Sequence, residues 1–185
     1  ATFGFNENFL FRDLVLYNSS YPVSHQNRDD LAWSGIGQGR VLVTPLHMAM
    51  IAGAVANKGV MMEPRLLYAV RNGRGQQRVM QASRVYRRSL PVDRAQMLCE
   101  QMLQTVQDGT GTRAALAGYA VGGKTGTAEV SNDKSIEPHA WYMGFIQDAR
   151  HPLAIVVLVE NGGGGGTVAA PIARRVMERA IALGY

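Results

Sequence analysis

A lysine, a threonine and a glycine in a row are the residues of this sequence best suited to bind an anion. Lys124-Thr125-Gly126-Thr127 lies inside a predicted strand and follows Gly122-Gly123. The Lys124 ammonium supplies charge and the Thr125 hydroxyl supplies a hydrogen-bond donor, which together suit a carboxylate. Because Gly126 has no Cβ, a peptide can approach the strand edge and add as a further strand. The alternative is a strand that contains these residues for structural reasons alone.

Other residues with possible chemistry favour structural roles. The glycine run Gly162 to Gly166 could cradle a phosphate, but it lacks the Lys-Ser/Thr pair of a P-loop and the spacing of a dinucleotide fingerprint, so we interpret it as a flexible link between the last strand and the last helix. We expect His139 to be a strand-end residue rather than a substrate contact, and Cys99 to be a small buried apolar residue. Trp141 and Tyr142 are expected to pack against neighbouring elements.

Three predicted strands carry or flank the Lys-Thr-Gly motif. They are Tyr119 to Val130, His139 to Ile146 and Leu153 to Glu160. Their short connections favour antiparallel neighbours. The apolar run Leu153 to Val159 lacks the alternation of a half-exposed strand, which predicts helices on both of its faces.

Three helices are predicted around these strands. Thr44-Pro45 supplies a hydroxyl cap and a first-turn proline for a helix over Leu46 to Asn57, which Lys58-Gly59 ends. Leu98, Met102 and Val106 form the apolar stripe of a second helix from about Asp93 to Asp108, closed by Gly109. The final helix, Val168 to Leu183, is expected to cover one face of the last strand with Val168, Ile172, Val176 and Ala180. The other face of the last strand is expected to be covered by the second helix or by chain outside this sequence.

The remaining segments show less regular patterns. The first forty residues are rich in turn formers and predict a long irregular connection. Val60 to Arg71 is expected to be extended and is followed by a turn at Asn72 to Gly75.

Composition bounds the class of protein. The 185 residues, 46% of them hydrophobic, predict one globular domain over residues 1–185. The net charge is +5, but the one basic cluster, Arg84, Arg87 and Arg88, has no interleaved aromatic residues, so we expect no nucleic-acid partner. One cysteine and four scattered histidines predict no disulfide, metal or cofactor. The longest apolar run, Leu153 to Val159, is far shorter than the roughly 20 residues of a membrane helix, so this segment itself is not expected to contact a membrane.

Several motif blocks resemble the penicillin-binding proteins, and among them the class B transpeptidases of cell-wall synthesis. The blocks, in the order that this family shows, are Gly37-Gln38-Gly39, Val43-Thr44-Pro45-Leu46, Ala56-Asn57-Lys58-Gly59, Gly123 to Glu129, His139 to Phe145 and Val168 to Ala173. They span nearly the whole chain.

The resemblance implies an α+β fold with a central antiparallel sheet packed between helices, and acyl transfer through a serine ester. It implies that Lys124 and Thr125 hold the terminal carboxylate of a stem peptide or β-lactam, and that Gly126 clears the path. The backbone N–H of Thr127 would be one of two oxyanion-hole donors, whose loss typically costs about 2.7–4 kcal/mol.

The chain departs from the family pattern in its nucleophile. The family's Ser-x-x-Lys opens a buried helix well before the Lys-Thr-Gly strand, whereas Ser131-Asn132-Asp133-Lys134 follows that strand, so we interpret this match as coincidental. Ser-x-Asn is absent. We therefore expect the chain to be the C-terminal part of a transpeptidase domain whose other motifs lie upstream of Ala1. A separate chain that bears those motifs is the alternative.

These observations predict part of a D,D-transpeptidase that cross-links peptidoglycan and binds penicillin, and that is inactive without the rest of its domain. The expected partners are D-Ala-D-Ala stem peptides, β-lactams and the N-terminal remainder of the domain. The expected location is the outer face of the bacterial cytoplasmic membrane, with an anchor outside this chain. The alternatives are a β-lactamase or penicillin sensor, which share Lys-Thr-Gly, and a non-catalytic module that binds peptide carboxylates or acts as a scaffold.

Overall fold

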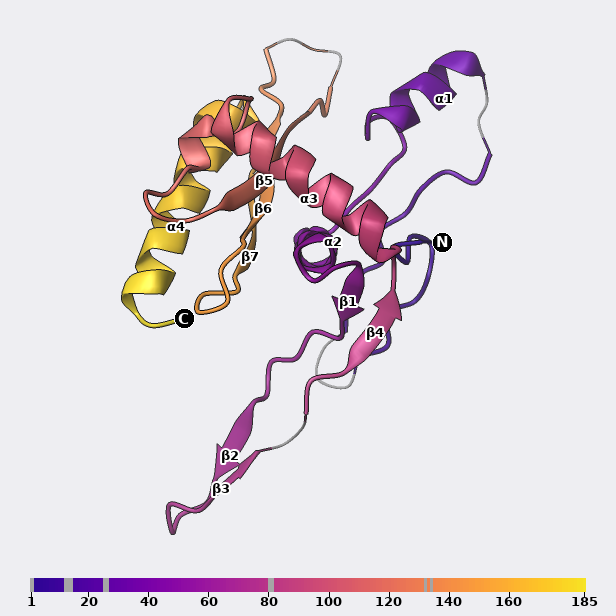
Figure 1. Ribbon diagram of the computed structural model, residues 1–185. Helices are drawn as coiled ribbons and strands as arrows, with labels where there is room; N and C mark the ends of the chain where they lie inside the picture. The colour runs from indigo at the N-terminus through magenta and orange to yellow at the C-terminus, as the bar shows by residue number, and fades with distance from the viewer. Residues whose placement is uncertain (1, 12–14, 25–26, 80–81, 132, 134) are drawn as a thin grey trace.

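A three-stranded antiparallel sheet lies at the centre of the structure, between two layers of helices (Figure 1). The structure is a computed structural model that describes residues 2–11, 15–24, 27–79, 82–131, 133 and 135–185. The strand order is β5 (Val121–Ala128), β6 (His139–Ile146) and β7 (Ala154–Val159), each antiparallel to its neighbour. This confirms the three predicted strands and their antiparallel pairing.

The two faces of the sheet are buried by different helices. Side chains alternate between faces along a strand, so Tyr142 and Phe145 of β6 point in opposite directions. Phe145 packs with Val55 of α2 (Pro45–Ala56) and with Cys99 and Met102 of α3 (Val92–Gln107). Tyr142 belongs to a second cluster with the small helix η1 (Thr112–Ala114) and with α4 (Ala170–Ala182). This arrangement confirms the predicted α+β fold with a sheet between helices.

Local signals define α2 and α3 much as predicted. The Thr44 hydroxyl accepts a hydrogen bond from the backbone N–H of His47, and Pro45 is the first residue of α2. The helix ends at Ala56, and Lys58 and Gly59, which follow it closely, both have positive φ. On α3 the predicted stripe is right at Met102 and Val106 and wrong at Leu98, which is 37% exposed. Ala95 and Cys99 are buried instead, because small side chains let the helix approach its neighbours closely.

The predicted inner face of the last helix was wrong at Ile172 and Val176, although Val168 does pack against the core. Ile172 and Val176 are exposed, whereas Ala170, Ala173 and Met177 face the sheet. Hydrophobicity alone favoured the larger side chains, but the close approach of α4 to the sheet selects alanine. The other face of β7 was expected to be covered by α3 or by chain outside this sequence. Instead, α2 packs against β7, while α3 packs mainly against β5. Helices do lie on both sides of β7, although most of its side chains are only half-buried.

The N-terminal segment is more regular than expected. It contains α1 (Arg28–Gly35), which begins where the Asn27 side chain accepts a hydrogen bond from the backbone N–H of Asp30. Phe9 and Phe11 pack with Met50 of α2, so this segment also contributes to the core. The turn formers that suggested an irregular connection include this helix cap, since asparagine serves both purposes.

Two two-stranded antiparallel sheets follow α2. β1 (Val60–Met62) pairs with β4 (Val85–Arg88), and between them in the chain β2 (Ala69–Arg71) and β3 (Gln77–Val79) form a hairpin. The hairpin of β2 and β3 surrounds the predicted turn at residues 72–75, where the Gly75 N–H donates a hydrogen bond to the carbonyl of Asn72. Figure 1 shows this hairpin projecting from the rest of the chain. Among the described residues, no helix is long and apolar enough to cross a membrane.

Candidate functional site

The edge of β5 that faces away from β6 presents backbone groups. Within the described part of the chain, no other strand pairs with this edge. The carbonyl oxygen of Thr125 accepts a hydrogen bond from Lys124 Nζ at 2.5 Å. The carbonyl oxygen of Thr127 accepts a hydrogen bond from Gln38 Nε2 at 2.8 Å. Both carbonyls therefore point away from β6. In an antiparallel strand the N–H and C=O of one residue point to the same side, so the Thr127 N–H also points toward this edge.

Lys124 and Thr125 extend toward opposite faces of the sheet. By register, Lys124 shares a face with Met143 and Thr125 shares the other with Tyr142. The Thr125 hydroxyl is hydrogen-bonded to the hydroxyl of Thr110 at 2.7 Å, while Lys124 bends back to the strand edge. The ammonium and the hydroxyl can thus meet one ligand only over that edge. Lys124 is exposed and, within the described ranges, forms no salt bridge, so its charge is available to an anion.

The glycines before the motif are explained by packing. A Cβ on Gly123 would overlap the Tyr142 hydroxyl, and one on Gly122 would overlap the ring of Phe145. Tyr142 is fully buried, and this burial raises the pKa of its phenol well above the usual value. Two aromatic rings from β6 therefore lie across the start of β5 and fix the strand that carries the motif.

Gly126 lies against the glycine run that connects β7 to α4. A Cβ on Gly165 would overlap the carbonyl oxygens of Gly126 and Trp141, and the Gly165 N–H donates to the Thr127 hydroxyl at 3.5 Å. The run connects the last strand and helix as predicted. It is not a loose link, however, because η2 (Gly165–Ala169) packs directly on β5 and β6. A Cβ on Gly126 would lie 3.2 Å from Trp141 Cβ, so internal packing also favours glycine there.

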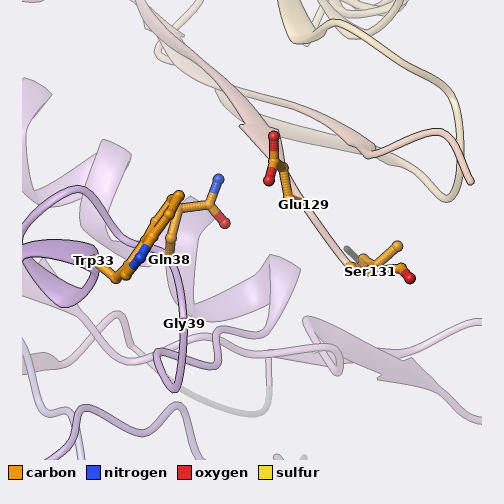
Figure 2. A pocket seen from close by; sticks show the side chains of 6 residues that line it. Trp33, Gln38, Gly39, Glu129 and Ser131 are labelled. Carbon is orange, nitrogen blue, oxygen red and sulfur yellow. The ribbon is translucent and has the colours of Figure 1, made fainter. Parts of the chain in front are cut away.

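A hollow of about 350 Å³, here named the β5-end hollow, adjoins the last residues of this strand. Its lining residues are Trp33, Gln38, Gly39, Glu129, Val130 and Ser131. Figure 2 shows Trp33 and Gln38 on one side and Glu129 and Ser131 on the other. The two walls come from residues about ninety apart in the sequence, joined by the Gln38 to Thr127 hydrogen bond, which spans 89 positions.

Ser131 does not have the surroundings of the family nucleophile. It follows β5 outside any helix, and its hydroxyl accepts a hydrogen bond from the Asp133 N–H at 3.0 Å. Asn132 and Lys134, the other residues of the Ser-x-x-Lys spelling, lie outside the described residues.

The remaining candidate residues, Cys99 and His139, have contacts that suit a structural role. Cys99 is buried, its thiol donates to Gln147 Oε1 at 3.4 Å, and burial raises its pKa, so the reactive thiolate is disfavoured. His139 accepts a hydrogen bond from the Asn161 N–H at the end of β6. Within the described ranges, no group of three or more His, Cys, Asp or Glu side chains could hold a metal ion.

The four predicted site residues, Lys124 to Thr127, lie together on one strand. Sequence reasoning missed two residues that contact them, Gln38 and Thr110. Gln38 had a signal, because it lies between two glycines in one of the motif blocks, although no role followed from it. Nothing in the local sequence marks Thr110.

Comparison with known proteins identifies the family of this chain. The family model described as the penicillin binding protein transpeptidase domain matches residues 2–178. A peptidoglycan D,D-transpeptidase PbpA of Mycolicibacterium smegmatis is 35% identical over 160 residues, which are 83% of this chain and 32% of that protein. The chain thus spans about a third of the length of this relative and of two PbpA proteins from Mycobacterium tuberculosis.

Solved structures give the same result for the fold. The crystal structure of PBPA from Mycobacterium tuberculosis has a TM-score of 0.84 and 33% identity, covering 97% of this chain and 44% of that one. A penicillin G acyl-enzyme complex of penicillin-binding protein A from M. tuberculosis has a TM-score of 0.82 and 32% identity, covering 97% and 41%.

Proposed function

The chain belongs to the transpeptidase domain family of class B penicillin-binding proteins, and we propose that it supplies the substrate-binding strand of a peptidoglycan D,D-transpeptidase. The observation that carries this proposal is the edge of β5 that no other described strand pairs with, where an exposed lysine, a threonine hydroxyl and the Thr127 N–H lie within four residues. The named relatives are D,D-transpeptidases, and one solved relative is a penicillin G acyl-enzyme.

Each group on this edge has a role in the proposed reaction. A stem peptide that ends in D-Ala-D-Ala adds along β5, with its terminal carboxylate at Lys124 and Thr125. A serine hydroxyl attacks the carbonyl between the two D-alanines, and the Thr127 N–H donates to the oxygen as it becomes negative. The terminal D-alanine leaves with the proton that the serine lost. An amine from a neighbouring stem peptide then attacks the acyl-serine carbonyl, the ester C–O bond breaks, and the proton lost by the amine returns to the serine oxygen, which leaves the new amide as the cross-link.

The nucleophilic serine in this proposal is not one of these 185 residues. It comes from a Ser-x-x-Lys elsewhere in the same domain, so the N-terminal remainder of that domain is the first partner of this chain. The surroundings of Ser131 and the short span of the chain relative to its relatives support this assignment. The active face lies outside the cytoplasmic membrane, where peptidoglycan is assembled.

Intact mass after incubation with benzylpenicillin tests the proposal. We expect the full-length parent protein to gain one penicillin adduct and the 185-residue chain to gain none, with circular dichroism checking that both are folded. An adduct on the isolated chain would overturn the assignment of the nucleophile, with Ser131 as the first residue to test. A folded parent protein without any adduct would favour the alternative of a module that binds peptide carboxylates without chemistry.

A further inference from the structure

Two threonine hydroxyls meet at β5, one from the strand itself and one from the segment that follows α3. The hydroxyl oxygens of Thr110 and Thr125 lie 2.7 Å apart, the usual distance for a hydrogen bond between two hydroxyls. Either oxygen can be the donor in this bond. Among the described residues the Thr110 hydroxyl has no second hydrogen-bond partner, so its proton is available to Thr125.

Packing on two sides holds Thr110 in this position. Gly109 lies against the last turn of α3, where a Cβ on it would be 2.8 Å from the Thr105 carbonyl oxygen. The Gly111 N–H donates a hydrogen bond to the same oxygen at 3.0 Å. From the other side, a Cβ on Gly166 of η2 would overlap the Thr110 carbonyl oxygen. The threonine is therefore fixed between α3, η2 and β5.

The direction of the hydrogen bond between the two threonines decides what Thr125 offers to a ligand. A hydroxyl has one proton to donate and accepts through its lone pairs. If Thr125 donates to Thr110, it turns lone pairs toward the ligand, and these repel an anion. If Thr110 donates instead, the Thr125 proton is free to bind a carboxylate, and the two hydrogen bonds in the chain strengthen each other.

We infer that Thr110 is a positioning residue for carboxylate recognition. Its hydroxyl donates to Thr125 and thereby directs the Thr125 proton toward the terminal carboxylate of the donor peptide or β-lactam. A carboxylate only accepts hydrogen bonds, so a bound ligand selects the chain that runs from Thr110 through Thr125 to the carboxylate. This inference rests on the proposed function, which places the carboxylate at Lys124 and Thr125.

Acylation of the full-length parent protein by two forms of one β-lactam tests the inference. Benzylpenicillin carries the carboxylate, and its methyl ester has the same ring system without the charge. We expect Thr110→Val to lower the second-order acylation rate constant for benzylpenicillin about fivefold and to leave that for the ester within about twofold of the wild-type value. Thr110→Ser keeps the hydroxyl and should retain both wild-type rate constants. Time-resolved intact mass measures each of them.

Further variants separate positioning from a general effect on the fold. Thr112→Val makes the same change two residues along the chain, where the hydroxyl has no hydrogen-bond partner among the described residues, and should leave both rate constants unchanged. In a Thr125→Val background, Thr110→Val should have no further effect on benzylpenicillin, because the residue acts through the Thr125 hydroxyl. Thr110→Ala removes the same hydroxyl with a smaller side chain and should repeat the result of Thr110→Val.

The outcomes separate this role from the reaction itself. An unchanged rate constant for benzylpenicillin in Thr110→Val, equal losses for benzylpenicillin and its ester, or a loss that persists in the Thr125→Val background overturns the positioning role while the reaction stands. If the wild-type parent protein forms no adduct with either compound, the proposed function fails and this inference fails with it. Because each ratio compares two compounds on one variant, a partial loss of folded protein does not imitate the result.

Discussion

The side-chain amide of Gln38 donates a 2.8 Å hydrogen bond to the carbonyl oxygen of Thr127, the residue that ends the Lys-Thr-Gly-Thr motif. This bond joins the turn after α1 to the strand edge proposed to bind substrate. The hydrogen bond lies on the same side of β5 as the Thr127 N–H. The position of that N–H thus depends on a segment from the other end of the chain.

Replacing Gln38 by glutamate should slow acylation of the full-length protein. A carboxylate of the same shape cannot donate to the Thr127 carbonyl and places a charge beside it, so we expect about a tenfold lower rate constant with benzylpenicillin, which corresponds to about 1.4 kcal/mol. Time-resolved intact mass measures this rate. Gln101→Glu, on the exposed side of α3, makes the same charge change away from the site. Equal rates for the two variants would contradict a positioning role for Gln38.

Removing the Thr127 N–H should affect acylation far more than removing the Thr127 hydroxyl. Proline at this position lacks the N–H, and the edge of a sheet tolerates proline where the N–H is not used in the ladder. We expect Thr127→Pro to lower the acylation rate of the parent protein about 10²- to 10³-fold, and Thr127→Val to lower it less than tenfold. Thermal unfolding of both variants shows whether the sheet is kept. A folded Thr127→Pro that acylates at the rate of Thr127→Val would rule out the oxyanion role.

A methyl group at Gly123 should destabilise the fold. It would overlap the buried hydroxyl of Tyr142, and overpacking of this kind typically costs about 1–3 kcal/mol. Gly73→Ala is the matched control, because a Cβ there meets no atom within 4 Å and the backbone φ is not positive. In urea unfolding, the free energy of unfolding of Gly123→Ala should be well below that of the wild type. That of Gly73→Ala should lie within about 0.5 kcal/mol of the wild-type value. Similar losses in both variants would contradict the packing account.

Stability should fall as the pH drops through the range where His47 takes up a proton. The ring is fully buried against Phe5 and Phe9, and Nε2 lies 2.7 Å from the Phe3 carbonyl oxygen. Burial lowers the pKa of His47, and nearby Arg87 lowers it further, while the Phe3 carbonyl and Glu7 act in the opposite direction. The unfolded chain therefore binds the proton more readily than the folded one, starting near the ordinary pKa of about 6.5.

Below that pH the free energy of unfolding should decrease, by at most about 1.4 kcal/mol per pH unit. The carboxyls with lowered pKa, Glu7, Asp133 and Asp148, lose their contribution only at more acidic pH. Urea unfolding at pH 7.5, 6.5 and 5.5 should thus show that the free energy of unfolding of the wild type falls with decreasing pH. The fall should be smaller in His47→Gln. An identical slope in both proteins would exclude His47 as its source.

Local sequence signals determined most of the elements that surround the site. Thr44-Pro45 and Lys58-Gly59 set the ends of α2 because caps and positive-φ glycines act over a few neighbouring residues. The short connections between apolar runs gave the antiparallel order of β5, β6 and β7. The motif itself placed Lys124, Thr125, Gly126 and Thr127 on one strand, since they are adjacent in the chain.

Only the tertiary structure decided which distant residues meet these four. Gln38 and Thr110 reach β5 only in the folded chain, through hydrogen bonds to Thr127 and Thr125, and no pattern in their own neighbourhoods encodes that contact. The face of α4 was likewise set by the distance to the sheet, which admits Ala170 and Ala173 and leaves Ile172 exposed. Short-range chemistry can be derived from the order of residues, whereas contacts across 89 positions and the fit of one surface to another depend on the whole packed chain.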